Sequence, residues 1–266
     1  MSRPIRHVVS LSGGKDSAAM AIYLRDRLPD LDYVFSDTDK ELPETYEYLA
    51  RIEAYLGKEI VRLRPDRGFD HWLEVYGGYL PSPRMRWCTK MLKIRPFESW
   101  VEKLGDVDVR MYVGIRADEN RGGYNPTKPN ITPVYPFIEA GITLDRVHQI
   151  LEDSGVGVPP YYSWRTRSGC YFCFYQRKHE WVGLKENHPD LFEKAKQYEK
   201  FDDESGERYT WSERESLNEL GTVKRIAEIK AKHEKLRPAV SKTNKLLHIL
   251  GQDDDDDVLP CSFCHV

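Results

Sequence analysis

The sequence contains no apolar run that approaches the roughly 18 residues a membrane-spanning helix needs. Its N-terminal residues also lack the apolar core of a secretory signal. We therefore expect a cytoplasmic protein with no membrane partner. The net charge is small, −3 over 266 residues, which excludes bulk attraction to nucleic acid but is compatible with local basic patches.

Cysteine is also scarce, with five residues in the whole chain. So few thiols in a reducing compartment are not expected to form a disulfide framework. They are nevertheless grouped, because Cys170 and Cys173 form one C-x-x-C pair, Cys261 and Cys264 form a second, and Cys88 lies upstream. This spacing is typical of a metal site, an iron–sulfur cluster or sulfur-transfer chemistry, and by itself it leaves all three open.

A glycine-containing stretch near the start of the chain carries the strongest signal. It reads Ser10-Leu11-Ser12-Gly13-Gly14-Lys15-Asp16-Ser17 and lies between the apolar His7–Val9 and the helix-like Ala18–Leu28. A strand, a tight turn and a helix N-terminus gather free backbone N–H groups in a positive potential. The glycines permit close approach of an anion, and Ser12, Ser17 and Lys15 add hydroxyl donors and a cation. The sequence therefore predicts a phosphate cradle.

Strand-like and helix-like patterns alternate after this loop. The expected strands are Leu31–Ser36, Glu59–Leu63 and Val109–Ile115, and the expected helices are Glu44–Leu56 and Thr89–Leu104. Such alternation with short connections predicts an α/β fold whose parallel sheet carries helices on both faces. Ligands of these sheets bind beyond the C-terminal ends of the strands, where the glycine loop and Asp37 both fall. We expect loops over 65–87 and 122–133, and a largely helical last seventy residues.

Several spaced motifs together resemble the phosphoadenylyl-sulfate (PAPS) reductase-like branch of the PP-loop ATP pyrophosphatases. They are Ser12–Ser17; Asp37-Thr38 with Pro43-Glu44-Thr45; Cys88-Thr89-Lys90 with Lys93 and Pro96; Gly114-Ile115-Arg116 with Glu119 and Arg121; and Gly169-Cys170-x-x-Cys173. The resemblance covers about two-thirds of the chain and implies an adenine nucleotide alpha hydrolase-like fold. We assign residues 1–195 to this nucleotide-binding domain. Residues 196–266 form a helical C-terminal region with an acidic linker and a cysteine-containing tail.

The resemblance also implies a reaction. PP-loop enzymes hold the β- and γ-phosphates of ATP while a nucleophile attacks the α-phosphate, which gives an adenylate and pyrophosphate. Sulfonucleotide reductases generally have a degenerate loop, whereas this loop is intact, and that favours ATP. Within the branch the chain looks most similar to the ATP pyrophosphatases of DNA phosphorothioation, of Dnd or Ssp type, which activate the DNA backbone for sulfur insertion. A sulfonucleotide reductase, a tRNA thiolase and a non-catalytic nucleotide-sensing subunit are the alternatives.

Each motif residue receives an expected role. Lys15, Asp37 and Arg116 are the expected catalytic residues, for pyrophosphate neutralisation, Mg²⁺ binding with ATP, and clamping of the α-phosphate. The expected nucleotide-binding residues are Ser10, Ser12, Gly13, Gly14, Lys15, Asp16, Ser17, Asp37, Thr38, Gly114 and Arg116. The expected substrate-binding residues are Lys90, Lys93, Glu119 and Arg121. Plainer roles remain open, because Asp37 can cap a turn and Arg116 can pair with Asp118 or Glu119.

For the thiols, the resemblance implies a [4Fe–4S] cluster held by Cys88, Cys170 and Cys173. Either Cys261 or Cys264 then supplies the fourth ligand, or the tail pair carries sulfur as a persulfide. Zinc and unliganded buried thiols are the alternatives. The implied partners are a cysteine desulfurase as sulfur donor, DNA, and a second copy of the chain.

Overall fold

The protein is described by a computed structural model that covers residues 3–28, 30–120, 122–201, 208–212 and 215–236. Its centre is a five-stranded sheet, and every neighbouring pair of strands is parallel. The strand order is β3-β2-β1-β4-β5. The strands are β1 (Ile5–Leu11), β2 (Leu31–Ser36), β3 (Ile60–Leu63), β4 (Asp108–Tyr112) and β5 (Ile131–Val134). The order changes direction between β1 and β4, so the loops that follow these two strands face a common crevice.

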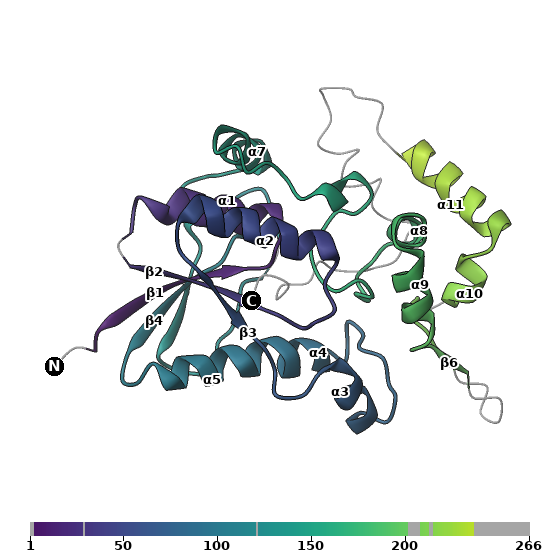
Figure 1. Cartoon of the computed structure of the whole chain (residues 1–266), viewed down its shortest axis with the longest axis horizontal. Helices are drawn as coiled ribbons and strands as arrows, with labels where there is room; N and C mark the ends of the chain where they lie inside the picture. The colour runs from purple at the N-terminus through teal and green to yellow at the C-terminus, as the bar shows by residue number, and fades with distance from the viewer. Residues whose placement is uncertain (1–2, 29, 121, 202–207, 213–214, 237–266) are drawn as a thin grey trace.

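Helices cover both faces of the sheet (Figure 1). One face is covered by α1 (Lys15–Arg25), α2 (Pro43–Leu56) and α7 (Leu144–Asp153), and the other by α5 (Arg95–Lys103). Successive residues of a strand point to opposite faces, and so Val9 packs in the first core while Val8 packs in the second. The predicted α/β fold with helices on both faces is confirmed.

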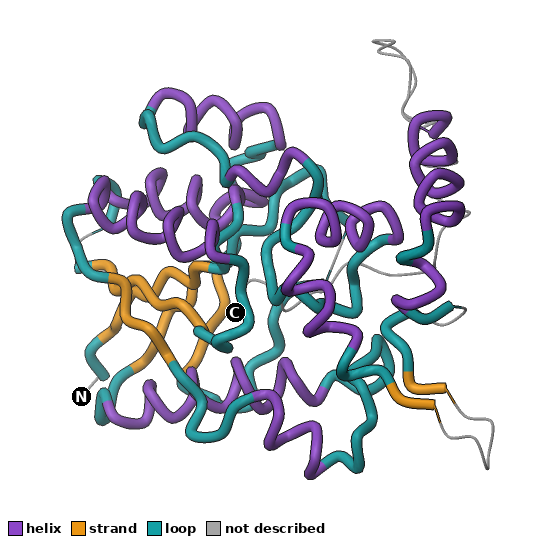
Figure 2. The backbone as a smooth tube through the Cα atoms, turned by 45° about the vertical axis from the view of Figure 1, so that its right-hand side comes forward, coloured by secondary structure: helices purple, strands orange, loops and turns teal. Residues whose placement is uncertain are grey.

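The remaining elements form a mainly helical lobe beside the sheet, seen on the right of Figures 1 and 2. They are α3 (Phe69–Val75), α4 (Trp87–Thr89), α8 (Lys178–Asn187), α9 (Pro189–Lys196), α10 (Leu217–Leu220), α11 (Val223–Leu236) and the hairpin β6 (Lys200–Phe201)–β7 (Arg208–Tyr209). Two short helices, α6 (Pro136–Glu139) and the 3-10 turn η2 (Pro160–Ser163), lie in the connections. The aromatic core of the lobe includes Trp87, Trp181 and Trp211. The predicted division of the chain at residue 195 stays a prediction.

The structure corrects two local expectations and adds a small hairpin to the helical C-terminal region. Residues 65–87 contain the helix α3, because Phe69 and Leu73 bury themselves in the aromatic core. The loop expected over 122–133 ends in β5, whose Pro133 is tolerated because β5 lies at the edge of the sheet and pairs only with β4. The C-terminal region also contains the small β6–β7 hairpin. No helix in the described ranges is long and apolar enough to cross a membrane.

The helix expected over 89–104 forms, but it contains one π-helical turn, η1 (Lys90–Ile94). Pro96 has no N–H group and cannot donate to the carbonyl of Leu92, so the regular ladder is interrupted here. The Arg95 N–H reaches back five residues to the carbonyl of Lys90. Such π turns are frequent at functional sites, and this one directly follows Cys88.

Candidate functional site

The two glycines of the loop between β1 and α1 are enclosed by other segments. Gly13 has φ +74°, and a Cβ atom there would lie 2.4 Å from the Cγ2 atom of Thr45 in α2. A Cβ atom on Gly14 would lie 2.8 Å from the Oγ atom of Ser168 and 3.2 Å from the hydroxyl of Tyr162. Both positions therefore require glycine for close packing as well as for access by an anion.

Hydroxyl groups converge on this loop. The Ser12 N–H donates to Ser17 Oγ at 3.1 Å, and Ser17 Oγ donates to the carbonyl of Gly14 at 3.1 Å. The Oγ atoms of Ser12 and Ser17 are also 3.1 Å apart. From a distant part of the chain, Ser168 Oγ donates to Ser12 Oγ at 3.1 Å. The loop thus presents three buried serine hydroxyls, which can reorient to donate to a phosphate.

The charged residues of the loop form one network. Asp16 accepts from Lys15 Nζ at 3.1 Å and from Arg116 Nη1 at 2.8 Å. Arg116 also pairs with Asp118 and Glu119, each at 3.0 Å. Asp16 therefore orients two cations beside the loop. Arg116 lies at the loop, as its predicted role requires, and it also forms the ion pairs with Asp118 and Glu119 that the sequence left open as an alternative.

The end of β4 packs directly against the loop. A Cβ atom on Gly114 would lie 3.1 Å from backbone atoms of Asp16 and Ser17. This close approach explains how Arg116, two residues further on, reaches Asp16 at all. The two loops on either side of the point where the strand order reverses are thus brought together, as the motif spacing predicts.

Asp37, directly after β2, is completely buried. Its Oδ1 atom accepts from the Tyr46 hydroxyl at 2.8 Å and from the Asp39 N–H at 3.1 Å, and its Oδ2 atom accepts from Arg64 Nε at 2.9 Å. The bond from Asp39 is the turn cap that the sequence left open as an alternative. The Arg64 side chain is 67% exposed, so a cation that binds Asp37 can displace it into solvent.

Glu41 is a buried residue that sequence reasoning missed. Its carboxylate accepts from Thr38 Oγ1 at 2.7 Å and from the Tyr46 hydroxyl at 3.2 Å, and burial raises its pKa. Thr38 Oγ1 also lies 3.2 Å from Cys170 Sγ. An isolated antiparallel bridge joins Glu41 to Cys170. The loop after β2 is therefore in direct contact with the first cysteine of the C-x-x-C pair.

The three cysteines of the described chain lie in one neighbourhood. Cys88, Cys170 and Cys173 form no disulfide with one another and pack against the aromatic core of the lobe. Burial, together with the neighbouring thiols, raises the pKa of Cys88 to about 12. Burial, together with the Glu41 carboxylate and Cys173, raises the pKa of Cys170 to about 12. The Lys93 ammonium group opposes this effect at both sulfurs, so it faces the same space. The distant Cys88 thus lies near the pair, and its predicted role as a ligand alongside Cys170 and Cys173 stays a prediction.

The three thiols are suitable ligands for a metal ion or an iron–sulfur cluster, but their side chains are not arranged as a metal-binding site. Within residues 3–236, apart from the undescribed gaps, no group of three or more His, Cys, Asp or Glu side chains is placed to hold a metal ion. Three thiols in an apolar setting, with a lysine to offset thiolate charge, nevertheless fit thiolate ligation in kind. Cys261, Cys264 and Arg121 lie outside the described residues. Of the expected substrate-binding residues, Lys90 is exposed and Lys93 is partly buried.

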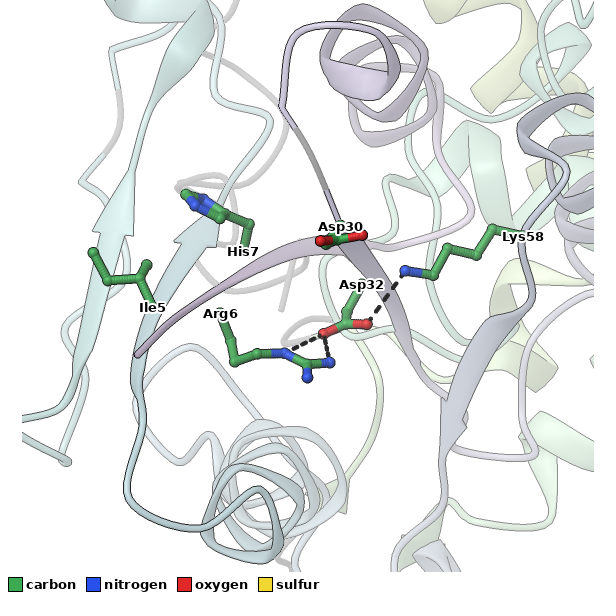
Figure 3. A pocket seen from close by; sticks show the side chains of 6 residues that line it. All are labelled: Ile5, Arg6, His7, Asp30, Asp32 and Lys58. Atoms are coloured by element: carbon green, nitrogen blue, oxygen red, sulfur yellow. Dashed lines mark hydrogen bonds and ion pairs between the residues drawn. The ribbon is translucent and has the colours of Figure 1, made fainter. Parts of the chain in front are cut away.

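A cavity lies at the amino ends of β1 and β2, away from the glycine loop (Figure 3). It is lined by Ile5, Arg6, His7, Asp30, Asp32 and Lys58. Both Arg6 and Lys58 pair with Asp32, so their charges are offset within the cavity. It is remote from the loops that carry the motifs, because parallel strands present their carboxyl ends at the other edge.

The fold and the site define a class, an α/β protein with a glycine loop at the point where the strand order of its parallel sheet reverses, and with thiols close by. The chain belongs to the phosphoadenosine phosphosulfate reductase domain family, whose model matches residues 6–173. The match spans the glycine loop, the Asp37 loop, Cys88, Arg116 and the C-x-x-C pair. Its boundaries enclose every motif on which the resemblance was based, apart from the tail cysteines.

Several proteins are similar in sequence to parts of this chain, and some of them have a named activity. An uncharacterized protein of Methanocaldococcus jannaschii is 29% identical over 198 residues, which are 70% of this chain and 40% of that protein. An adenosine 5'-phosphosulfate reductase of Staphylococcus haemolyticus is 29% identical over 46% of this chain and 47% of its own. A tRNA-specific 2-thiouridylase of Lacticaseibacillus paracasei is 30% identical over 44% of this chain and 35% of its own. The chain thus spans less than half the length of each of these three relatives.

Proposed function

We propose that the protein is an ATP pyrophosphatase that activates an acceptor by adenylation for sulfur insertion, with the DNA backbone as acceptor. The observation that carries the proposal is the intact loop Ser12–Ser17. It combines two enclosed glycines, three converging hydroxyls and a lysine, and the residue next but one to Ser168 is the thiol of Cys170. One segment, Ser168 to Cys170, therefore contributes both to the proposed phosphate site and to the proposed sulfur site.

The residues divide the work between the two ends of ATP. Lys15 and the backbone N–H groups of the loop hold the β- and γ-phosphates and offset the charge that grows on departing pyrophosphate. Asp37 holds Mg²⁺ together with the phosphates, after Arg64 has swung aside. Arg116 leaves part of its ion-pair network to clamp the α-phosphate. Lys90, Lys93 and Arg121 supply positive charge for a polyanionic acceptor.

Sulfur insertion then takes three steps. A non-bridging oxygen of the acceptor phosphate attacks the α-phosphorus of ATP, and pyrophosphate leaves. The outer sulfur of a persulfide then attacks the acceptor phosphorus, and AMP leaves with the original oxygen. A neighbouring thiol finally cleaves the S–S bond, which leaves sulfur on the acceptor and a disulfide on the donor side. A cysteine desulfurase is the class of enzyme that generates the persulfide.

Cys88, Cys170 and Cys173 are the residues that would hold a [4Fe–4S] cluster, with Cys261 or Cys264 as fourth ligand. With three cysteine ligands alone, such a cluster would offer one open iron that can bind sulfide, whereas a fourth cysteine ligand would close that position. The test is spectroscopic and does not depend on activity: Cys170→Ser should remove the brown absorbance and most of the iron from protein purified without oxygen. Stoichiometric zinc and no iron in the unmodified protein would overturn the assignment.

Two relatives support two different alternatives to this reaction. The tRNA-specific 2-thiouridylase acts on tRNA, and its likeness to this chain supports tRNA thiolation as the alternative to DNA. The adenosine 5'-phosphosulfate reductase supports sulfonucleotide reduction instead. The intact loop favours either of the ATP-consuming reactions over the reductase.

The experiment offers both acceptors to the same enzyme. Protein, cysteine desulfurase, ATP, Mg²⁺ and radiolabelled cysteine are incubated with duplex DNA or with tRNA, and nuclease digests are analysed for label. We expect label in DNA with the unmodified protein and none with Lys15→Ala. Lys58→Ala is the matched control, since Lys58 pairs with Asp32 at the opposite edge of the sheet. Label in tRNA alone would refute the DNA assignment, and reduction of adenosine 5'-phosphosulfate without ATP would refute the proposal as a whole.

A further inference from the structure

The segment from Tyr161 to Cys170 touches the phosphate loop at three points. The Tyr161 hydroxyl donates to the carbonyl of Gly13 at 2.7 Å. The Lys15 N–H donates to the Tyr162 hydroxyl at 3.3 Å, and Ser168 Oγ donates to Ser12 Oγ at 3.1 Å. The segment lies almost 150 residues further along the chain than the loop. Together these contacts make it a second wall of the phosphate site.

Ser168 is the contact that lies against Gly14, the residue at the N-terminus of α1. Its side chain is 4% exposed, and its Oγ atom stands 2.8 Å from the point where a Cβ on Gly14 would be. It therefore lies directly over the bare α-carbon at the N-terminus of α1, where an anion is favoured. Its partner Ser12 has a second hydroxyl neighbour in Ser17, so Ser12 keeps a bond if Ser168 turns away.

A buried arginine fixes the position of this serine. Arg165 is 1% exposed and donates to the carbonyl of Gly169 at 3.1 Å and to the carbonyl of Cys170 at 2.8 Å. The backbone on the C-terminal side of Ser168 is thereby held while its hydroxyl stays able to rotate. Because the backbone is already fixed and only the hydroxyl has to rotate, redirecting this hydroxyl to a ligand costs little conformational entropy.

We infer that Ser168 is a specificity-determining residue of the nucleotide site, whose hydroxyl turns from Ser12 to donate to the β- and γ-phosphates. The inference rests on the proposed function, because it takes ATP as the nucleotide. Hydrogen bonds to an ionised phosphate are about twice as strong as those between neutral groups. Ser168 thus favours ATP and pyrophosphate over AMP and sulfonucleotides, which lack these phosphates. It also links the occupied phosphate site to Cys170, two residues away.

The test uses three ligands and isothermal titration calorimetry on the full-length protein. The ligands are inorganic pyrophosphate, AMP, and α,β-methylene-ATP, which cannot be cleaved between its α- and β-phosphates. Ser168→Ala should weaken binding of pyrophosphate and of the ATP analogue about tenfold, as expected for a lost bond to a charged group, and leave AMP binding unchanged. Ser163→Ala is the matched control, since Ser163 is exposed and donates within its own turn to Pro160.

The outcomes separate the inference from the proposed function. If Lys15→Ala weakens binding of pyrophosphate but Ser168→Ala behaves like Ser163→Ala, the inference is wrong and the proposed function stands. If the unmodified protein binds neither pyrophosphate nor the analogue, both are wrong. An equal loss for all three ligands would also overturn the inference. Ser168→Cys keeps the shape of the side chain with only a weak donor, and it should reproduce the selective loss if the alanine variant fails to fold.

Discussion

Replacing Gly13 by alanine tests whether the phosphate loop is as tightly enclosed as the structure indicates. An L-residue at φ +74° costs about 1–2 kcal/mol. The new Cβ would also lie 2.4 Å from Thr45 Cγ2, and overpacking of this kind costs about 1–3 kcal/mol. Thr45 is 1% exposed in α2 and has no open space to retreat into. We therefore expect Gly13→Ala to lower the free energy of unfolding by about 2–5 kcal/mol.

Urea denaturation monitored by tryptophan fluorescence measures this loss, and two further variants divide it into its causes. Gly57→Ala has the same backbone strain, with φ +65°, but no atom lies within 4 Å of its new Cβ, so it should lose only about 1–2 kcal/mol. Thr45→Ser removes the clashing methyl group and should restore about 1–3 kcal/mol in the Gly13→Ala background. Equal losses for the two glycine variants, or no recovery with Thr45→Ser, would refute the reasoning.

Three further predictions concern buried groups. Tyr46→Phe removes the one hydroxyl proton that Asp37 and Glu41 share and should cost about 2 kcal/mol in urea denaturation; a loss within the error of the measurement would contradict the described bonds. Hydrogen bonds from Arg225 lower the pKa of Glu215 to about 2. The stabilisation is therefore complete above pH 4.5, the ordinary pKa of a glutamate, and is lost as the pH falls from 4.5 towards 2. Glu215→Gln should flatten the fall in melting temperature over that range, and an unchanged profile would speak against the pair. With pKa values of about 12, Cys88 and Cys170 in metal-free protein should react with iodoacetamide at pH 8 roughly a thousandfold more slowly than free cysteine, as followed by mass spectrometry, and rapid alkylation of either would be inconsistent with their burial.

The sequence predicts the first half of the site well because its signals are local. The order strand, glycine loop and helix over residues 5–25 depends on neighbours in the chain, and the structure reproduces it. The helix α2 begins at Pro43 and ends at Gly57, whose φ of +65° is the stop that glycine supplies. Arg116 also reaches the loop as expected, since β1 and β4 are adjacent strands.

The second wall of the site was not predictable, because its residues carry no local signal. Tyr161, Tyr162 and Ser168 lie in an irregular stretch where neither helical nor strand periodicity indicates a buried face. Their positions are set by tertiary contacts, among them the Arg165 bonds to the backbone around Gly169. Glu41 was missed for a related reason, since a carboxylate in a turn is normally exposed, and hydrogen bonds from Thr38, Tyr46 and the Lys40 N–H, among others, make its burial tolerable.

The assignments of Asp37 and of the thiols illustrate what spacing can and cannot predict. Spacing identified the residues that come together, and the bridge between Glu41 and Cys170 joins the two motifs. Spacing does not specify the side-chain contacts, and Asp37 proves to be held by Arg64 and Tyr46. The role of the thiols in cluster binding is a proposal that the Cys170→Ser experiment tests, and the role of Asp37 in Mg²⁺ binding is likewise a proposal.

The central claim is that the loop cleaves ATP between its α- and β-phosphates, and the products of the reaction test it most directly. ATP labelled in the α- or the γ-phosphate is incubated with the protein, Mg²⁺, acceptor and sulfur donor, and the products are separated by chromatography. We predict AMP and pyrophosphate in equal amounts with the unmodified protein, and neither with Lys15→Ala. ADP and free phosphate as the products would contradict the account.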